Sequence, residues 1–183
     1  MKELSLNILD IAQNSVKAKA DKINIVLEET DETFLFSVED NGCGMTADFL
    51  ESVTNPFTTT RTTRKVGLGI PLLQLAATQT GGNVEIESRH ESEYPESHGT
   101  KTSALFYKNH IDFTPLGDIV STVVTLIQGQ PDIEWNFSHS KGGKKVELHT
   151  EEMKAILGDV PLDNFEVITW IGEYLSEQYE ELS

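Results

Sequence analysis

Three polar residues share one face of a predicted helix near the N-terminus. Asp10, Asn14 and Lys17 stand four and three residues apart, which places a carboxylate, an amide and an ammonium in one line. An amide oxygen suits Mg²⁺, whose other ligands are usually water and substrate phosphates. The segment therefore indicates a metal–phosphate site, although a solvent-exposed polar stripe has the same spacing.

A second group of residues follows a predicted strand, in the run Glu39-Asp40-Asn41-Gly42-Cys43-Gly44-Met45. The carboxylate of Asp40 could accept a hydrogen bond from an exocyclic amine. Gly42 and Gly44 would let the backbone pass close to a flat ring. This pattern points to a base-binding loop, and the alternative is a plain hairpin turn, because Asp-Asn-Gly is favourable turn chemistry.

A third group combines cations with glycines. Arg61, Arg64 and Lys65 place three positive charges within five residues of an otherwise acidic chain, and Gly67-Leu68-Gly69 opens a predicted helix. Backbone N–H groups and the positive dipole end at a helix start favour phosphate. The segment predicts an anionic ligand, with an exposed loop and a helix cap as the alternative.

Hydrophobic spacing predicts the elements that position these groups. Helical periodicity predicts helices at 3–18, 67–80, 116–127 and 163–180, with shorter ones at 47–53 and from residue 150 onward. Alternation predicts strands at 23–28, 34–40, 83–89, 101–108, 133–138 and 145–149. The result is an α+β fold, a sheet with helices on one face followed by a smaller helix–hairpin–helix appendage.

Composition narrows the functional classes. The chain has 183 residues and a formal net charge of −16. The negative phosphates of nucleic acids and of anionic lipids would repel so acidic a chain, so neither nucleic acid nor membrane is an expected partner. Its single cysteine, Cys43, fits a reducing cytoplasm. Residues 110–183 carry 4 basic and 14 acidic side chains, against 10 and 16 in residues 1–109. This asymmetry predicts a ligand-binding domain at 1–109 and a small α+β region of unknown role at 110–183.

Taken in order, these motifs resemble the GHKL ATPase superfamily, which includes sensor histidine kinases, anti-sigma-factor kinases, DNA gyrase and MutL. Asn14 falls in its N-box, and Asp40, Gly42 and Gly44 match its first glycine box. Residues 55–61 and 66–70 look most like the lid and second glycine box of histidine kinases, and Gly99-Thr100 matches the last box. The resemblance covers residues 3–108.

The resemblance implies a Bergerat-type sandwich of a mixed sheet and helices that binds Mg²⁺ and ATP. It implies that Asn14 holds Mg²⁺ and that Asp40 reads the adenine amine, with Gly42, Gly44 and Thr100 beside it. The groups expected to face the phosphates are Lys17, Arg61, Lys65, Gly67, Leu68 and Gly69.

Two features depart from the family pattern. Asp10 stands where hydrolytic members carry a glutamate base, and its side chain is one methylene shorter, which leaves it at most a weak base. The chain begins at the N-box helix, without a helical hairpin that bears a phosphoacceptor histidine. Its five histidines are expected to be ordinary surface or strand residues, at positions His90, His98, His110, His139 and His149.

Three functions remain open at this point. The first is an ATPase or kinase-like module, as a monomer or a homodimer, that acts on a separate protein as histidine kinases and anti-sigma-factor kinases do. The second is a non-catalytic ATP sensor whose lid and C-terminal region bind a partner. The third is an adaptor that has lost its ligand, which the intact glycine motifs argue against.

Overall fold

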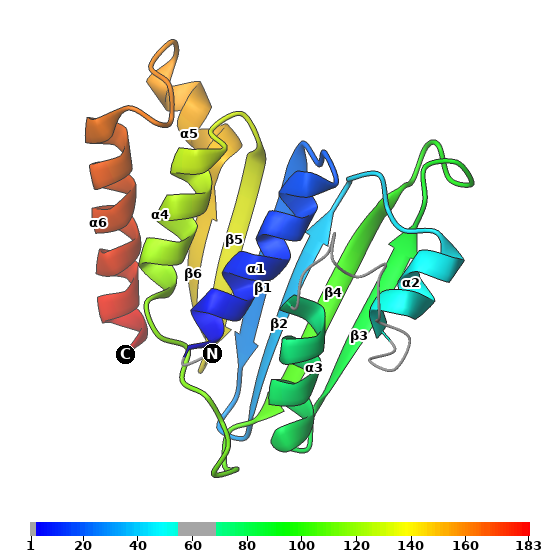
Figure 1. Ribbon diagram of the computed structural model, residues 1–183. Helices are drawn as coiled ribbons and strands as arrows, with labels where there is room; N and C mark the ends of the chain where they lie inside the picture. Colours follow the sequence, from blue (N-terminus) through cyan, green and yellow to red (C-terminus); the bar gives the residue numbers. More distant parts are fainter. Residues whose placement is uncertain (1–2, 55–68) are drawn as a thin grey trace.

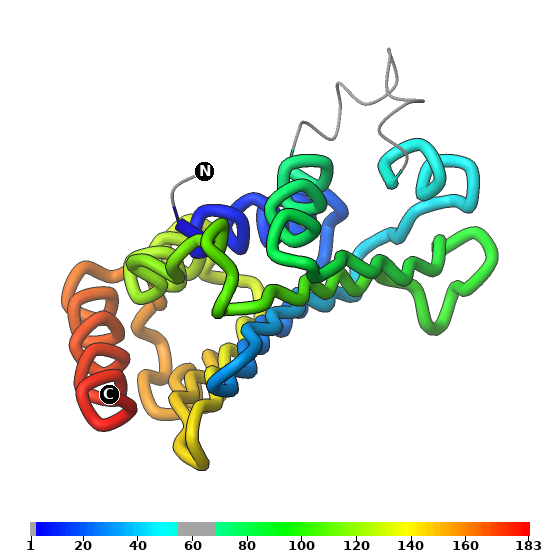
Figure 2. The backbone as a smooth tube through the Cα atoms, turned by 90° about the horizontal axis from the view of Figure 1, so that it is seen from below, coloured from blue at the N-terminus to red at the C-terminus, as the bar shows by residue number. Residues whose placement is uncertain are grey.

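The computed structural model describes residues 3–54 and 69–183 and confirms the predicted α+β class (Figure 1). A single six-stranded sheet carries its helices on one face, as the edge-on view in Figure 2 shows for α1, α3, α4 and α6. The described elements are α1 (Leu4–Lys17), β1 (Lys22–Glu29), β2 (Thr33–Asp40), α2 (Ala47–Thr54), α3 (Gly69–Gln79), β3 (Asn83–Arg89), β4 (Gly99–Tyr107), α4 (Ile119–Gly129), β5 (Glu134–Lys141), β6 (Lys144–His149), α5 (Thr150–Leu157) and α6 (Phe165–Leu182).

The sheet has the strand order β3-β4-β2-β1-β5-β6. All neighbouring strands are antiparallel except β1 and β5, which run parallel with Ile25 opposite Phe137. The predicted C-terminal hairpin therefore extends the same sheet from its β1 edge. Its helix α4 packs against both α1 and α6, so the C-terminal region shares one layer of helices with the rest of the described chain.

Strand alternation explains where the core lies. In β2, Phe34, Phe36 and Val38 are buried under the helices, whereas Leu35, Ser37 and Glu39 point to the opposite face. The other strands follow the same period, so one face of the sheet is apolar and covered and the other is largely polar. This alternation places Asp40, the last residue of β2, on the covered side, where the helices can reach it.

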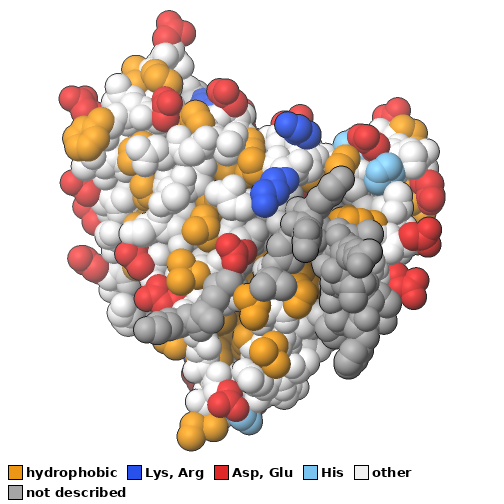
Figure 3. All heavy atoms as spheres, in the orientation of Figure 1, with side chains coloured by type: hydrophobic (Ala, Val, Ile, Leu, Met, Phe, Trp, Pro, Cys, Tyr) orange, Lys and Arg blue, Asp and Glu red, His pale blue; other side chains and the backbone are white. Residues whose placement is uncertain are grey.

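Acidic side chains dominate much of the surface. Figure 3 shows them along α6 and around the tip of the β3–β4 hairpin. Within residues 3–54 and 69–183, no helix is both long enough and apolar enough to cross a lipid bilayer.

A partly buried polar cluster joins α6 to the sheet. The Nδ1 atom of His139 lies 2.9 Å from the Tyr179 hydroxyl, and its Nε2 lies 3.1 Å from Oε1 of Glu29. Lys108 donates to Oε2 of Glu29 at 2.7 Å, and the Lys141 ammonium lies 3.7 Å from the same oxygen. His139 is thus a structural residue of the core, which its place in an alternating strand did not reveal.

This cluster predicts a loss of stability in mild acid. Burial lowers the pKa of His139 more than its bond to Glu29 raises it, so the folded protein favours the neutral imidazole. Its contribution to the free energy of unfolding is complete above the ordinary histidine pKa of about 6.5 and is lost as the pH falls through that value towards the lowered one. Burial raises the pKa of Glu29, but the lysines and His139 outweigh it and lower this pKa, so Glu29 loses its own contribution only at lower pH.

Urea unfolding at about pH 7.5 and about pH 5.5 measures this difference. The His139→Gln variant is expected to lose most of the change in unfolding free energy between the two pH values. The control variant His110→Gln removes an exposed histidine and should show the same change in unfolding free energy as the wild type. An unaltered change in the His139 variant would contradict the assignment.

Candidate functional site

A cavity of about 240 Å³ lies between α1, the loop after β2 and the start of α3. Five of the residues singled out from the sequence line it, namely Asn14, Lys17, Asp40, Gly44 and Thr100. The rest of its wall is mainly apolar and includes Ile11, Met45, Phe49 and Ile70. Residues from three separate sequence motifs therefore meet around one partly apolar cavity, the usual character of a small-molecule site.

The Asp40 carboxylate is a polar group of this cavity that several hydrogen bonds hold in place. Asp40 is 9% exposed to solvent. Its Oδ1 accepts hydrogen bonds from the backbone N–H of Gly42 at 2.8 Å and of Thr100 at 3.3 Å. Its Oδ2 accepts one from the Ser15 hydroxyl at 2.5 Å. Three donors thus fix the carboxylate in one orientation, with lone pairs left for a ligand donor.

Ser15 is a site residue that the sequence reasoning missed. It is 3% exposed and lies on the buried side of α1 with Ile8, Ile11 and Ala12. The available signal was a hydroxyl in the apolar stripe of an amphipathic helix. Such a group must find a buried partner, and the partner here is Asp40.

Two motif glycines allow close backbone contacts near the site, Gly44 with β3 and Gly99 with Asp40. Gly44 has a φ of +74°, and a Cβ at this position would lie 1.9 Å from the carbonyl oxygen of Arg89. Gly99 has a φ of +148°, and its Cβ would lie 2.0 Å from the carbonyl oxygen of Asp40. No other residue type fits either position without moving the backbone, so both motif glycines have a structural reason.

The polar face of α1 forms another part of the cavity wall. Asn14 and Lys17 line the cavity itself, and Asp10 lies one turn earlier in the helix. A Cβ on Gly69 would lie 3.5 Å from the Cβ of Asp10, so this aspartate faces the beginning of α3. Burial raises the pKa of Asp10, and the positive charge of Lys17 partly offsets this effect.

Four of the residues predicted to face phosphate lie outside the described part of the chain. They are Arg61, Lys65, Gly67 and Leu68. Gly69 is described and forms the first residue of α3. Within the described residues, no group of three or more His, Cys, Asp and Glu side chains could hold a metal ion.

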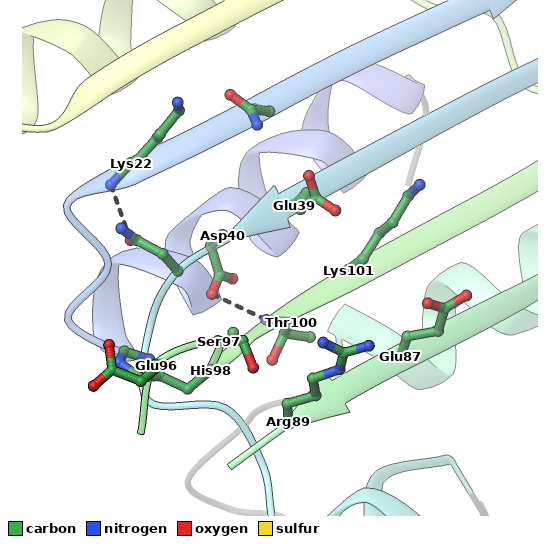
Figure 4. Close-up of a pocket in the computed structure, with 13 residues that line it drawn as sticks. Lys22, Glu39, Asp40, Glu87, Arg89, Glu96, Ser97, His98, Thr100 and Lys101 are labelled. Atoms are coloured by element: carbon green, nitrogen blue, oxygen red, sulfur yellow. Dashed lines mark hydrogen bonds between the residues drawn. The ribbon is translucent and has the colours of Figure 1, made fainter. Parts of the chain in front are cut away.

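A larger cavity, of about 440 Å³, lies on the open face of the sheet (Figure 4). Its walls carry charges of both signs, including Glu39, Glu87, Arg89 and Lys101. The two cavities share Asp40 and Thr100. We assign the ligand site to the smaller cavity because it alone combines an apolar wall with the motif residues of α1.

Comparisons with known proteins identify the family and the fold of the chain. The family model described as "Histidine kinase-, DNA gyrase B-, and HSP90-like ATPase" matches residues 2–112. Among curated proteins, none matches the sequence.

Two solved structures show the same fold at low sequence identity. The MutL ATPase domain of Aquifex aeolicus, complexed with ADP, is 14% identical with a TM-score of 0.55, and the match covers 86% of this chain and 69% of that one. The N-terminal domain of a DNA repair protein is 17% identical with a TM-score of 0.56, over 87% of this chain and 58% of that one.

Proposed function

The chain belongs to the family of histidine kinase-, DNA gyrase B- and HSP90-like ATPases, and we propose that it is a Mg-ATP-binding module that acts on a separate protein. ATP binding is the property of the family. The transfer of the γ-phosphate of ATP to a partner protein is what we propose. The observation that carries the nucleotide site is the Asp40 carboxylate, oriented by three donors at the wall of an apolar cavity.

The adenine base would occupy the part of the cavity next to Asp40. Its exocyclic amine would donate to the carboxylate, and the ring would lie against apolar side chains such as Met45 and Phe49. Guanine carries a carbonyl oxygen where adenine carries the amine, so it would place an acceptor against an acceptor. The site should therefore prefer adenine nucleotides over guanine nucleotides.

The phosphates would lie towards Lys17 and the start of α3, where backbone N–H groups are available. Asn14 offers an amide oxygen in the same wall, and this donor fits a Mg²⁺ ion that takes its other ligands from phosphate and water. Such an ion would supply positive charge that neutralises the phosphate oxygens. Lys17 would contribute a second, fixed positive charge.

We expect intrinsic hydrolysis to be slow, as in a kinase-like protein rather than a fast ATPase. Asp10 is shorter than the glutamate base of hydrolytic relatives, and its raised pKa shows that burial disfavours its charged form, the form that can accept a proton. A protein substrate that brings its own nucleophile has no need of this base. We therefore expect the γ-phosphate to be used on a separate partner rather than released rapidly to water.

A non-catalytic ATP sensor is the second candidate, and the surface of α6 favours it. Phe165 is 82% exposed and Trp170 is 48% exposed. The rings of Trp170 and Tyr174 stack with their centroids 5.2 Å apart. Exposed aromatic side chains of this kind are typical of surfaces that bind other proteins.

Two measurements test the proposal. Calorimetric titration with Mg-ATP, Mg-ADP and Mg-GTP is expected to show binding of the adenine nucleotides and much weaker binding of GTP. Incubation with γ-labelled ATP and candidate partner proteins is expected to transfer label to protein faster than to inorganic phosphate. Equal affinity for GTP would contradict the adenine site. Rapid release of phosphate by the wild-type chain alone would contradict the kinase-like role, and binding without either reaction would favour the sensor.

A further inference from the structure

The loop from Gly42 to Met45, which we call the glycine loop, is held from outside by the hairpin of β3 and β4. The Nδ1 atom of His98 lies 2.5 Å from the carbonyl oxygen of Gly42. The backbone N–H of Glu91 donates to the carbonyl oxygen of Cys43 at 2.8 Å. Two carbonyl groups of the loop therefore have their partners in a hairpin some fifty residues further along the chain.

Ser88 provides a third attachment, at the end of the loop. Its Oγ accepts a hydrogen bond from the backbone N–H of Met45 at 2.7 Å. The same Oγ lies 2.7 Å from the Thr100 hydroxyl and 3.3 Å from the carbonyl oxygen of Gly99. One hydroxyl thus joins the glycine loop to the Gly99-Thr100 motif, and both segments line the cavity around Asp40.

Ser88 is a polar residue on the side of β3 that otherwise packs against the hydrophobic core. It stands on the same side of β3 as Val84 and Ile86, both of which pack against the core. An apolar residue would be expected on that side, since the face is covered by helices. A half-buried serine there needs hydrogen-bond partners, and those that its side chain has within residues 3–54 and 69–183 belong to the two nucleotide-site segments.

We propose that Ser88 and His98 are positioning residues of the nucleotide site, which hold the glycine loop and Thr100 in the geometry that receives the base. This proposal rests on the nucleotide site proposed above. Neither side chain lines the smaller cavity, so both act through the segments they hold. Loss of either attachment lets the glycine loop move away from Asp40, and nucleotide affinity falls because the site is no longer preformed.

The test compares wild type with Ser88→Ala, Ser88→Thr, His98→Ala and His90→Ala. The threonine variant keeps the hydroxyl. His90 is the matched control, because it lies in the same hairpin and its ring bonds only to Ser92 among the described residues. Hydrogen exchange of the Met45 amide is measured without nucleotide, and the affinity for Mg-ADP is measured by calorimetry.

We expect Ser88→Ala to speed exchange at the Met45 amide and to weaken Mg-ADP binding roughly three- to tenfold, which corresponds to one hydrogen bond. Ser88→Thr should restore both values. His98→Ala should weaken binding to a similar degree, and His90→Ala should change neither.

Two outcomes would overturn the proposal. One is wild-type exchange at Met45 in Ser88→Ala. The other is wild-type affinity in both Ser88→Ala and His98→Ala. If the wild-type protein itself bound no nucleotide, the proposed function would fail. The exchange measurement would still decide whether Ser88 holds the loop, because it needs no nucleotide.

Discussion

Replacing Asp40 with alanine is expected to weaken ATP binding by about 1.5–3 kcal/mol, which is roughly one to two powers of ten in Kd. Among the described residues that line the apolar cavity, Asp40 is the only carboxylate, so its variant would leave the amine of adenine buried without that acceptor. Asp40→Asn keeps one carbonyl oxygen and should show a smaller loss. Calorimetric titration with Mg-ATP measures both values.

Glu39 supplies the matched control for this prediction. It precedes Asp40 in β2 but points to the open face of the sheet, so Glu39→Ala removes an equal charge away from the cavity. Asp40→Ala also leaves the Ser15 hydroxyl without its partner, and urea unfolding should therefore be recorded for each variant. Unchanged ATP affinity in a folded Asp40→Ala protein would remove Asp40 from the site.

Asn14→Ala is expected to abolish the dependence of ATP binding on Mg²⁺. The amide oxygen of Asn14 is the oxygen donor that α1 offers to a cation in the cavity wall. The variant should bind ATP equally weakly with Mg²⁺ and with a chelator, whereas the wild type should bind far more tightly with Mg²⁺. Titrations under the two conditions measure this ratio directly.

Gln13→Ala is the control for the Asn14 variant. Gln13 is the preceding residue of α1, it is exposed, and it does not line the cavity. Its loss should leave the Mg²⁺ dependence intact. Asn14 is only half-buried, so we expect the fold of its variant to survive. A wild-type response to Mg²⁺ in Asn14→Ala would refute the N-box assignment.

Local periodicity accounts for most of the secondary structure. Alternation over Phe34, Phe36 and Val38 predicted β2 and its end at Asp40, and the structure has this strand at Thr33–Asp40. The apolar stripe that includes Ile8 and Ile11 predicted a helix at 3–18, and α1 spans Leu4–Lys17. These predictions hold because side-chain burial repeats with the period of each element, which one sequence window contains.

Contacts between distant segments could not be predicted in the same way. The parallel pairing of β1 with β5 joins residues more than a hundred positions apart. The sequence of neither strand indicates which strand it will pair with. The cluster of Glu29, His139 and Tyr179 depends on this pairing and on the packing of α6. Each strand could pair with several others, so the strand order depends on how the whole fold packs.

The sequence by itself predicted which residues would carry the chemistry of the site, because Asn14, Asp40 and the motif glycines have types and spacings that local rules can interpret. Only the tertiary structure decided how Asp40 is held. Its donor Ser15 comes from α1, and the loop beside it is fixed by Ser88 on β3. A hydrogen bond requires two groups within about 3 Å, and for groups far apart in the chain only the folded backbone sets that distance.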